Sequence, residues 1–318
     1  YKQVALLEFL NKQGHWARSG PLSKTLNCSY EVFKALESRN LISIEMVNTR
    51  RDPLSRLSFI LAPPPVFTSS QQAAWNSIKE LTANSYQLSV SPLVFLLFGV
   101  TGSGKTEIYL KALAHVIAMG KRGICLIPEI ALTSQTVERF ANRFPGRVAI
   151  LHSGLSLGEQ FDEWQWIKEG NCDVVIGPRS ALFAPQPDLG LIIIDEEHEW
   201  THKQEDKSPR YHARNVALKL AELHNAAVIL GSATPDIDSF HKAQLGEYHL
   251  VELRERITPR GYSPLPEVNI VDMKEELKAG NRSLFSRALI AAMRKTLAQG
   301  EQIILFLNRR GTATFIQC

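Results

Sequence analysis

The stretch Gly99–Thr106 constrains the fold more than any other part of the sequence, because it satisfies the phosphate-loop pattern G-x-x-x-x-G-K-[ST]. Residues 93–98 before it form an unbroken apolar run, as expected of a strand buried on both faces of a parallel sheet. Residues 107–119 after it have a helical pattern that ends at Gly120. A glycine-rich turn of this kind brings backbone N–H groups to a helix N-terminus, which favours anions. The stretch therefore predicts an α/β fold with a nucleotide phosphate site.

The residues of this loop have distinct predicted roles. Lys105 is expected to reach the β- and γ-phosphates of ATP, and the Thr106 hydroxyl is expected to bind Mg²⁺. Gln71, upstream of the predicted sheet, is a candidate to recognise adenine. The predicted nucleotide-binding residues are Gln71, Gly99, Val100, Thr101, Gly102, Ser103, Gly104, Lys105, Thr106 and Glu107.

Five further strands are predicted downstream, at residues 123–127, 148–151, 174–176, 191–194 and 227–230. Helical patterns separate most of them, and this alternation predicts a doubly wound parallel sheet. Each strand ends in polar residues. Because ligands of an open α/β sheet bind beyond the carboxyl ends of its strands, we expect these polar ends to line one edge beside the phosphate loop.

Two of these polar ends carry the predicted chemistry. Asp195 follows an aliphatic run at a strand end, so it is expected to hold Mg²⁺, with Glu196 activating the water that attacks the γ-phosphate. The predicted catalytic residues are Lys105, Asp195, Glu196 and His198. The predicted coupling residues, which sense the γ-phosphate through His198, are Ser232, Ala233 and Thr234.

Residues 1–61 have the pattern of a small winged-helix domain. Three short helical segments precede two predicted strands, at residues 41–47 and 56–61, which flank a basic tip. Residues 1–60 contain nine Lys and Arg against five Asp and Glu, a difference of four that equals the net charge of +4. Arg50 and Arg51 are therefore predicted to contact DNA phosphates, although modules of this type also serve as protein docking pieces.

The rest of the chain divides by composition. A stiff proline-rich linker is predicted at residues 62–66, an ATP-binding lobe at 67–252, and the start of a truncated second lobe at 253–318. In this last part, a strand is predicted at residues 269–273, a helix at 286–298 and a further buried strand at 302–307. The chain has no apolar run of the ~20 residues that span a bilayer and no signal-peptide pattern. We therefore expect no membrane association and a cytoplasmic location.

The motifs and their order resemble those of the superfamily 2 DEAH-type helicases. This resemblance rests on three motifs: the phosphate loop, the acidic box Asp195-Glu196-Glu197-His198, and the tripeptide Ser232-Ala233-Thr234. Stretches similar to the replication-restart helicase family of primosomal protein N′ (PriA) lie at residues 98–107, 128–133, 151–156, 177–185 and 305–311. The resemblance implies a RecA-like sheet. It also implies an ATP-dependent 3′ to 5′ DNA helicase that recognises stalled or repaired forks and restarts bacterial replication.

The resemblance further implies contacts with single-stranded DNA. Pro128, Thr133 and Arg179 match positions that contact the strand, and an aromatic-rich loop follows the acidic box. Aromatic rings suit stacking on bases and cations suit phosphates, while a packed surface loop is the alternative. The DNA-binding residues expected in this loop are Trp200, Lys203, Tyr211, His212 and Arg214. The implied partners are forked and single-stranded DNA, primosome and helicase-loader proteins, and single-stranded DNA-binding protein, in the bacterial cytoplasm at the nucleoid.

Four scattered cysteines form neither a disulfide framework nor a complete zinc site. Cys28, Cys125 and Cys172 are expected to be reduced, packed thiols. Cys318 is the expected first ligand of the family's zinc site, whose other ligands are missing here, so residues 1–318 are not expected to hold zinc. The family's N-terminal DNA-binding domain and later arginine finger are also missing, so we expect a fragment that is largely inactive by itself.

Two other functions stay open from the sequence. One is a different superfamily 2 DNA translocase that tracks along a duplex without separating its strands. The other is a nucleotide-gated scaffold that binds forks and recruits partners without essential turnover.

Overall fold

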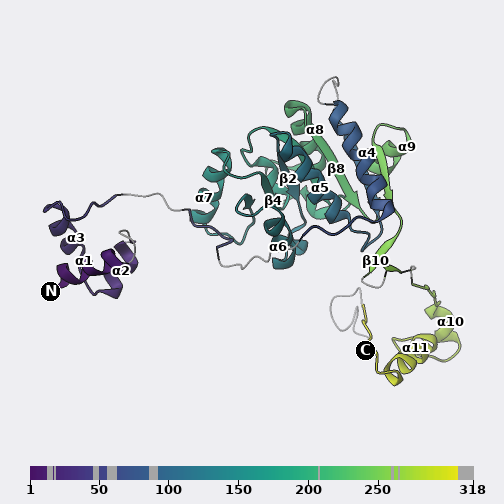
Figure 1. Cartoon of the computed structure of the whole chain (residues 1–318). Helices are drawn as coiled ribbons and strands as arrows, with labels where there is room; N and C mark the ends of the chain where they lie inside the picture. Colours follow the sequence, from purple (N-terminus) through teal and green to yellow (C-terminus); the bar gives the residue numbers. More distant parts are fainter. Residues whose placement is uncertain are drawn as a thin grey trace. The chain divides into compact units, whose positions relative to one another are not determined.

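The computed structural model describes residues 1–12, 17, 19–45, 50–55, 63–85, 92–206, 208–258, 261–263 and 266–306. The chain divides into two compact units, Tyr1–Gly261 and Tyr262–Cys318. Figure 1 shows the helices and strands of both units, coloured along the sequence.

A seven-stranded sheet with the order β3-β4-β2-β5-β8-β1-β9 forms the centre of the first unit. Its strand pairs are parallel. The strands are β1 (Val94–Gly99), β2 (Arg122–Leu126), β3 (Val148–Ile150), β4 (Val174–Gly177), β5 (Leu189–Asp195), β8 (Ala227–Ser232) and β9 (His249–Leu253). The six predicted strands are therefore confirmed. Strand β9 was not predicted, and it lies at the sheet edge beside β1.

Helices cover both faces of this sheet, as the doubly wound fold requires (Figure 1). One face packs against α4 (Ser69–Ser85), α5 (Lys105–Ala118) and α6 (Ser134–Arg143). The other face packs against α7 (Leu157–Lys168), α8 (Ala213–His224) and α9 (Ile237–Gln244). Because side chains alternate along a strand, Leu97 and Leu96 of β1 enter opposite cores. The predicted α/β fold class is confirmed.

Short elements at the carboxyl edge of the sheet connect strands to helices. They are η1 (Glu129–Ala131), η2 (Arg179–Phe183), η3 (Trp200–His202) and the antiparallel pair of β6 (Lys203–Gln204) and β7 (Tyr211–His212). Each follows a parallel strand at the end where ligands of such sheets bind. They therefore carry several of the predicted functional residues.

The N-terminal residues form three short helices, α1 (Lys2–Lys12), α2 (Ser19–Thr25) and α3 (Tyr30–Glu37). A small core of their own includes Leu6, Leu22, Phe33 and Leu36. Residues 41–45 of the first predicted strand are irregular. Residues 46–49 and the second predicted strand at 56–61 lie outside the described residues, whereas residues 50–53 of the predicted basic tip are described. The three helices agree with a winged helix, and the complete domain stays a prediction.

Strands β10 (Arg256–Thr258) and β11 (Gly261–Ser263) lie near the boundary between the units. The second unit contains α10 (Met273–Lys278) and α11 (Arg287–Ala298), and α11 was predicted. The predicted strand at 269–273 is wrong, because the Asp272 carboxylate instead caps α10 by accepting a hydrogen bond from the Lys274 backbone N–H at 2.7 Å. Residues 302–306 of the last predicted strand have no strand pairing.

The cysteine prediction is confirmed in the described residues, where Cys28, Cys125 and Cys172 are buried and free. Among the described helices, none combines the length and apolarity needed to cross a membrane.

Candidate functional site

The phosphate loop is held open between β1 and α5. Gly104 precedes α5 in the left-handed region at φ 83°, where a side chain would also collide with the Gln71 amide. The Lys105 ammonium lies inside the loop and donates a hydrogen bond to the Gly99 carbonyl at 2.9 Å. The buried Ser103 hydroxyl has no hydrogen-bond partner among the described residues. A cradle with a cation and an unsatisfied hydroxyl fits the phosphates of a nucleotide.

Two segments outside the loop fix its backbone. The Gln71 amide donates to the Ser103 carbonyl at 3.2 Å, while its oxygen accepts the Thr68 backbone N–H at 3.0 Å. After β9, the Arg256 Nε donates to the Thr101 carbonyl at 3.1 Å. Gln71 thus supports the loop, and its contact with adenine stays a prediction. Arg256, the first residue of β10, was missed because neither β9 nor β10 was predicted.

Asp195 ends β5 beside the phosphate loop, as predicted. The hydroxyl of Tyr109, a residue buried in α5, donates a hydrogen bond to Asp195 Oδ1 at 2.9 Å. Burial, and then the neighbouring charge of Glu196, raise the pKa of Asp195 to about 6, while the Tyr109 hydrogen bond and the Lys105 charge act in the opposite direction. The hydrogen bond from Tyr109 therefore fixes the orientation of the Asp195 carboxylate.

Tyr109 reaches Asp195 by passing over Gly231 of β8. Gly231 pairs directly with Asp195 in the sheet, and a Cβ atom at Gly231 would overlap the Tyr109 hydroxyl and its ring carbon. Tyr109 was missed because an aromatic residue four positions after Lys105 reads as core. The glycine after the aliphatic run of β8 was the available signal that another group approaches there.

Glu196 follows Asp195 with a left-handed backbone, at φ 46°. Its carboxylate lies 3.8 Å from Lys105 Nζ and 3.6 Å from His198 Nδ1. This places the predicted water-activating group directly beside the phosphate loop. The Asp195 carboxylate and the Thr106 hydroxyl supply oxygen atoms of the kind that Mg²⁺ prefers, so the residues fit the predicted cation.

The predicted coupling residues are linked to the acidic strand end. His198 Nδ1 lies 2.7 Å from the Ser232 hydroxyl, which also accepts the Thr234 backbone N–H at 2.9 Å. Ser232 is buried, and Ala233 lies between the two hydroxyl residues. The structure therefore joins His198 to this turn, and signalling through it stays a prediction.

Glu197, the third acid of the box, has a structural environment. Its side chain is buried and accepts hydrogen bonds from Arg214 Nη1 at 3.0 Å, the Asp236 backbone N–H at 2.7 Å and the Ser239 hydroxyl at 3.0 Å. The carboxylates of Glu197 and Asp236 raise the pKa of Arg214 despite its partial burial. Arg214, predicted to contact DNA, thus has protein partners, and its DNA contact stays a prediction.

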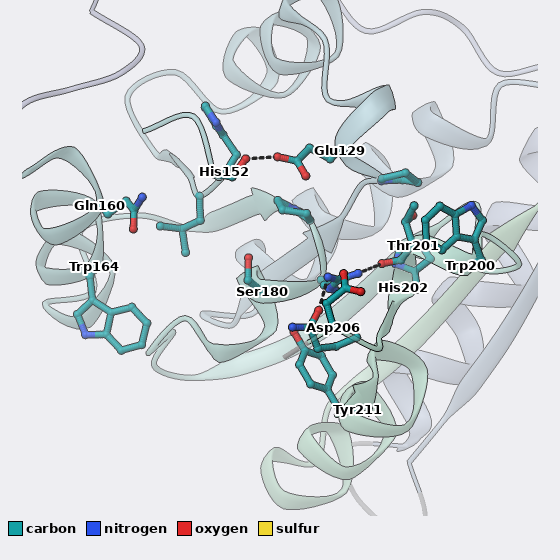
Figure 2. Close-up of a pocket in the computed structure, with 16 residues that line it drawn as sticks. Glu129, His152, Gln160, Trp164, Ser180, Trp200, Thr201, His202, Asp206 and Tyr211 are labelled. Atoms are coloured by element: carbon teal, nitrogen blue, oxygen red, sulfur yellow. Dashed lines mark hydrogen bonds between the residues drawn. The ribbon is translucent and has the colours of Figure 1, made fainter. Parts of the chain in front are cut away.

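An open groove of about 680 Å³ lies beyond the strand ends (Figure 2). Its lining includes Pro128, Glu129, His152, Gln160, Trp164, Arg179, Trp200 and Tyr211. Figure 2 shows Trp164 and Trp200 on opposite sides of this groove. Trp200 is 76% exposed. Exposed rings beside a cation suit unpaired bases and phosphates.

Arg179 organises one wall of the groove. Its guanidinium donates to the carbonyl oxygens of Thr201 at 2.7 Å and Lys203 at 2.9 Å, and also to the Gln204 side chain. The adjacent His202 Nε2 lies 3.0 Å from the Asp195 carbonyl oxygen. One segment therefore connects the groove wall to the acidic strand end.

Trp164 of α7 was not predicted to belong to this groove. Exposed apolar side chains recur on α7 at Leu157, Phe161 and Trp164, which share one helical face. That spacing was visible in the sequence, but it reads as an ordinary core stripe.

The other predicted DNA contacts lie in varied surroundings. Thr133 caps α6, His212 caps α8, and the Lys203 ammonium pairs with Glu205 at 2.6 Å. The Arg50 guanidinium pairs with the fully buried Glu163 at 2.5 Å and lies 3.5 Å from the centre of the Trp166 ring. Arg51 pairs with Asp162 at 3.3 Å. Contact of these side chains with DNA stays a prediction.

Zinc binding is not tested by the structure, because Cys318 lies outside the described residues. Within the described ranges, no group of three or more His, Cys, Asp or Glu side chains is placed to hold a metal.

Residues 68–243, more than half of the chain, match the DEAD/DEAH box helicase family. The chain therefore belongs to the DEAD/DEAH box helicases, a class that implies ATP as the nucleotide and Mg²⁺ as the cation of the site described above.

Curated relatives narrow this class and confirm the resemblance seen in the motifs. The replication restart protein PriA of Bacillus subtilis (strain 168) is 46% identical over 100% of this chain and 38% of the relative. That of Synechocystis sp. is 42% identical over 99% of this chain and 37% of the relative. The chain thus spans less than two fifths of these relatives. Among solved structures, the chain is similar to RecG bound to a three-way DNA junction, with 24% identity and a TM-score of 0.45. The match covers 62% of this chain and 25% of the RecG chain.

Proposed function

We propose that the chain is the ATP-binding motor region of a replication-restart DNA helicase that moves 3′ to 5′ along DNA. One observation carries this proposal: the phosphate loop and the acidic end of β5 share the sheet edge that opens into the groove with Trp200, Arg179 and Tyr211. A site with this geometry brings nucleotide hydrolysis and strand binding within reach of each other.

The chain's own groups divide the work of hydrolysis. The loop N–H groups, Lys105 and the Ser103 hydroxyl bind the phosphates. Asp195 and Thr106 would hold Mg²⁺, which would supply positive charge beside the transferring phosphoryl group. Glu196 orients the attacking water and accepts its proton.

Two connections couple the groove to this chemistry. His202 joins the groove wall to the backbone of Asp195, and Arg214 joins the start of α8 to Glu197 and the start of α9. A bound DNA strand that shifts the segment held by Arg179 therefore also displaces the groups that are hydrogen-bonded to the acidic box. The aromatic-rich segment at residues 200–212 is the proposed coupling element.

The finer parts of the proposal come from the curated relatives, which are named replication restart proteins. We propose forked and single-stranded DNA as substrates and helicase-loader, primosome and single-stranded DNA-binding proteins as partners, in the bacterial cytoplasm. Two-lobed motors complete their catalytic site with an arginine from the second lobe, a group worth about 10³- to 10⁵-fold in rate. Residues 1–318 by themselves are therefore proposed to bind ATP with little turnover, and zinc is proposed for the longer chain.

ATP hydrolysis by residues 1–318 and by the complete chain, each with and without forked DNA, tests the proposal. The complete chain should be strongly stimulated by DNA and should unwind forks with a 3′ single-stranded tail, whereas Trp200→Ala should reduce the stimulation. The loss reflects base stacking, worth about 1–3 kcal/mol per base. Absence of unwinding by the complete chain would instead indicate a duplex-tracking translocase or a scaffold.

A further inference from the structure

A second hollow, of about 330 Å³, lies on the side of the lobe covered by α4, α5 and α6. Its lining residues are Trp75, Lys79, Lys111, Ala114, His115 and Arg143. We call it the flank hollow. Three permanent cations and an imidazole surround it, and the described part of the lining contains no carboxylate.

The three cations of the flank hollow have no ion-pair partner among the residues that the structure describes. Within the described part of the chain, the side chains of Lys79, Lys111 and Arg143 have neither an ion pair nor a hydrogen bond. Other basic residues of the same lobe differ, since Arg122 pairs with Asp188 at 3.0 Å and Arg147 pairs with Asp173 at 2.6 Å. Like charges grouped without counter-ions repel one another, so an anion in the hollow relieves this repulsion.

His115 gives a second, independent indication. Its Nε2 atom is buried and has no hydrogen-bond partner among the described residues. Its ring packs edge-on against Trp75, with ring centres 5.5 Å apart. Burial and then the charge of Lys79 lower the pKa of His115. The imidazole thus experiences the positive charge of the hollow, and its Nε2 atom has no hydrogen-bond partner among the described residues.

The flank hollow is distinct from the nucleotide site and the groove, because it shares no lining residue with the groove and lies further along α5. At 1.5 Å per residue, Lys111 and His115 lie about 9 Å and 15 Å along the helix from Lys105. Helix α6 links the hollow to the groove, since Pro128 and Glu129 line the groove just before α6 and Arg143 is its last residue. The ten residues of α6 span about 15 Å.

We propose that the flank hollow binds backbone phosphates of the duplex arm that adjoins the strand in the groove. The inference rests on the proposed function, because it needs a DNA substrate with both single-stranded and duplex parts. Phosphates of one strand are spaced about 3.4 Å apart along a duplex, so the 15 Å length of α6 corresponds to about four to five base pairs. A duplex that begins at the groove and runs along α6 is therefore long enough, within its first turn, to reach Arg143 and its neighbours.

The test measures the salt dependence of DNA binding by fluorescence anisotropy. The probes are a fork and a short single strand that fills only the groove, and the variants are Lys79→Gln, Lys111→Gln, Arg143→Gln and the triple. Each cation that neutralises a phosphate contributes about 0.9 to the slope of log affinity against log salt. Tripling the salt should therefore weaken fork binding by wild type about 20-fold more than by the triple variant. Lys168→Gln, which removes an exposed lysine of α7 with no ion pair to any described residue, is the matched control.

An unchanged fork slope in the triple variant overturns the inference, as does an equal change for the short strand or for Lys168→Gln. If wild type itself binds no fork, the proposed function fails instead, so the two failures are distinguishable. A second measurement follows the His115 imidazole by NMR. Fork binding should raise its pKa in wild type, because a phosphate stabilises the charged ring. A rise produced by polyglutamate and not by the fork would identify an acidic protein segment as the ligand and overturn the inference.

Discussion

The carboxyl edge of the sheet and the flank hollow differ in whether their charged side chains have hydrogen-bond or ion-pair partners within the described part of the protein. At the edge, Asp195 is hydrogen-bonded to Tyr109, and Glu197 is hydrogen-bonded to Arg214. In the hollow, Lys111 has no partner among the described side chains. Groups that act on a transferring phosphoryl group must be fixed in advance, because reorganisation would cost rate. Groups that only attract phosphates need no such support.

The largest expected effect is at Lys105. Lys105→Ala should abolish hydrolysis, since it removes the point charge inside the loop, whereas Glu196→Gln should leave ATP bound and uncleaved. Phosphate release by the complete chain, paired with titration calorimetry, measures both. Normal turnover in Glu196→Gln would show that another group activates the water. The carboxyl edge would then not hold the catalytic carboxylate in a fixed position, and the contrast with the flank hollow would be lost.

Arg214→Met should have the next largest effect, on stability. It leaves Glu197 as an uncompensated buried charge, a change that costs about 3–5 kcal/mol. Urea unfolding measures the loss. The control is Lys219→Ala, which breaks the exposed pair with Glu222 and should cost at most about 1 kcal/mol. Equal losses in the two variants would contradict a structural role for the Arg214 pair.

Tyr109→Phe should lower stability by less, because it removes one hydrogen bond to a charged group, worth about 1.5–3 kcal/mol. The variant should also need more Mg²⁺ for half-maximal nucleotide binding, since Asp195 loses its fixed orientation. Unfolding and a Mg²⁺ titration of nucleotide affinity measure the two effects. Tyr30→Phe, at an exposed tyrosine of α3, should change neither value.

The smallest expected effect belongs to the flank hollow. Lys111→Gln should change the free energy of unfolding by at most about 0.5 kcal/mol, because no described partner is lost. A slight gain is consistent with relief of repulsion from Lys79. A loss as large as that of Arg214→Met would mean that Lys111 supports the fold, and the contrast between the two regions would fail.

The sheet was predictable because its strands are continuous aliphatic runs that end in polar residues, as in residues 191–195. The phosphate loop and acidic box were predictable because their chemistry requires fixed residue types at fixed spacing. Pairings between side chains that are distant in the sequence were not predictable. Arg214 and Glu197 are 17 residues apart, and nothing local distinguishes a cation that binds a buried acid from one that binds DNA.

The same limit applies to Arg50 and to β9. A basic residue in a proposed wing reads as a phosphate contact until Glu163 and Trp166 are seen around it. Strand β9 carries exposed as well as buried residues because it lies at the sheet edge, so its pattern is weaker than that of the central strands.

The passage of Tyr109 over Gly231 has a consequence for how this sequence can change with time. Any side chain at position 231 meets the tyrosine hydroxyl, while loss of the hydroxyl leaves Asp195 without its support. Neither position is therefore free to vary first, although 122 residues separate them. Substitution of Tyr109 or Gly231 alone is therefore expected to give a less stable or less active protein. Only a simultaneous change at both positions avoids this intermediate.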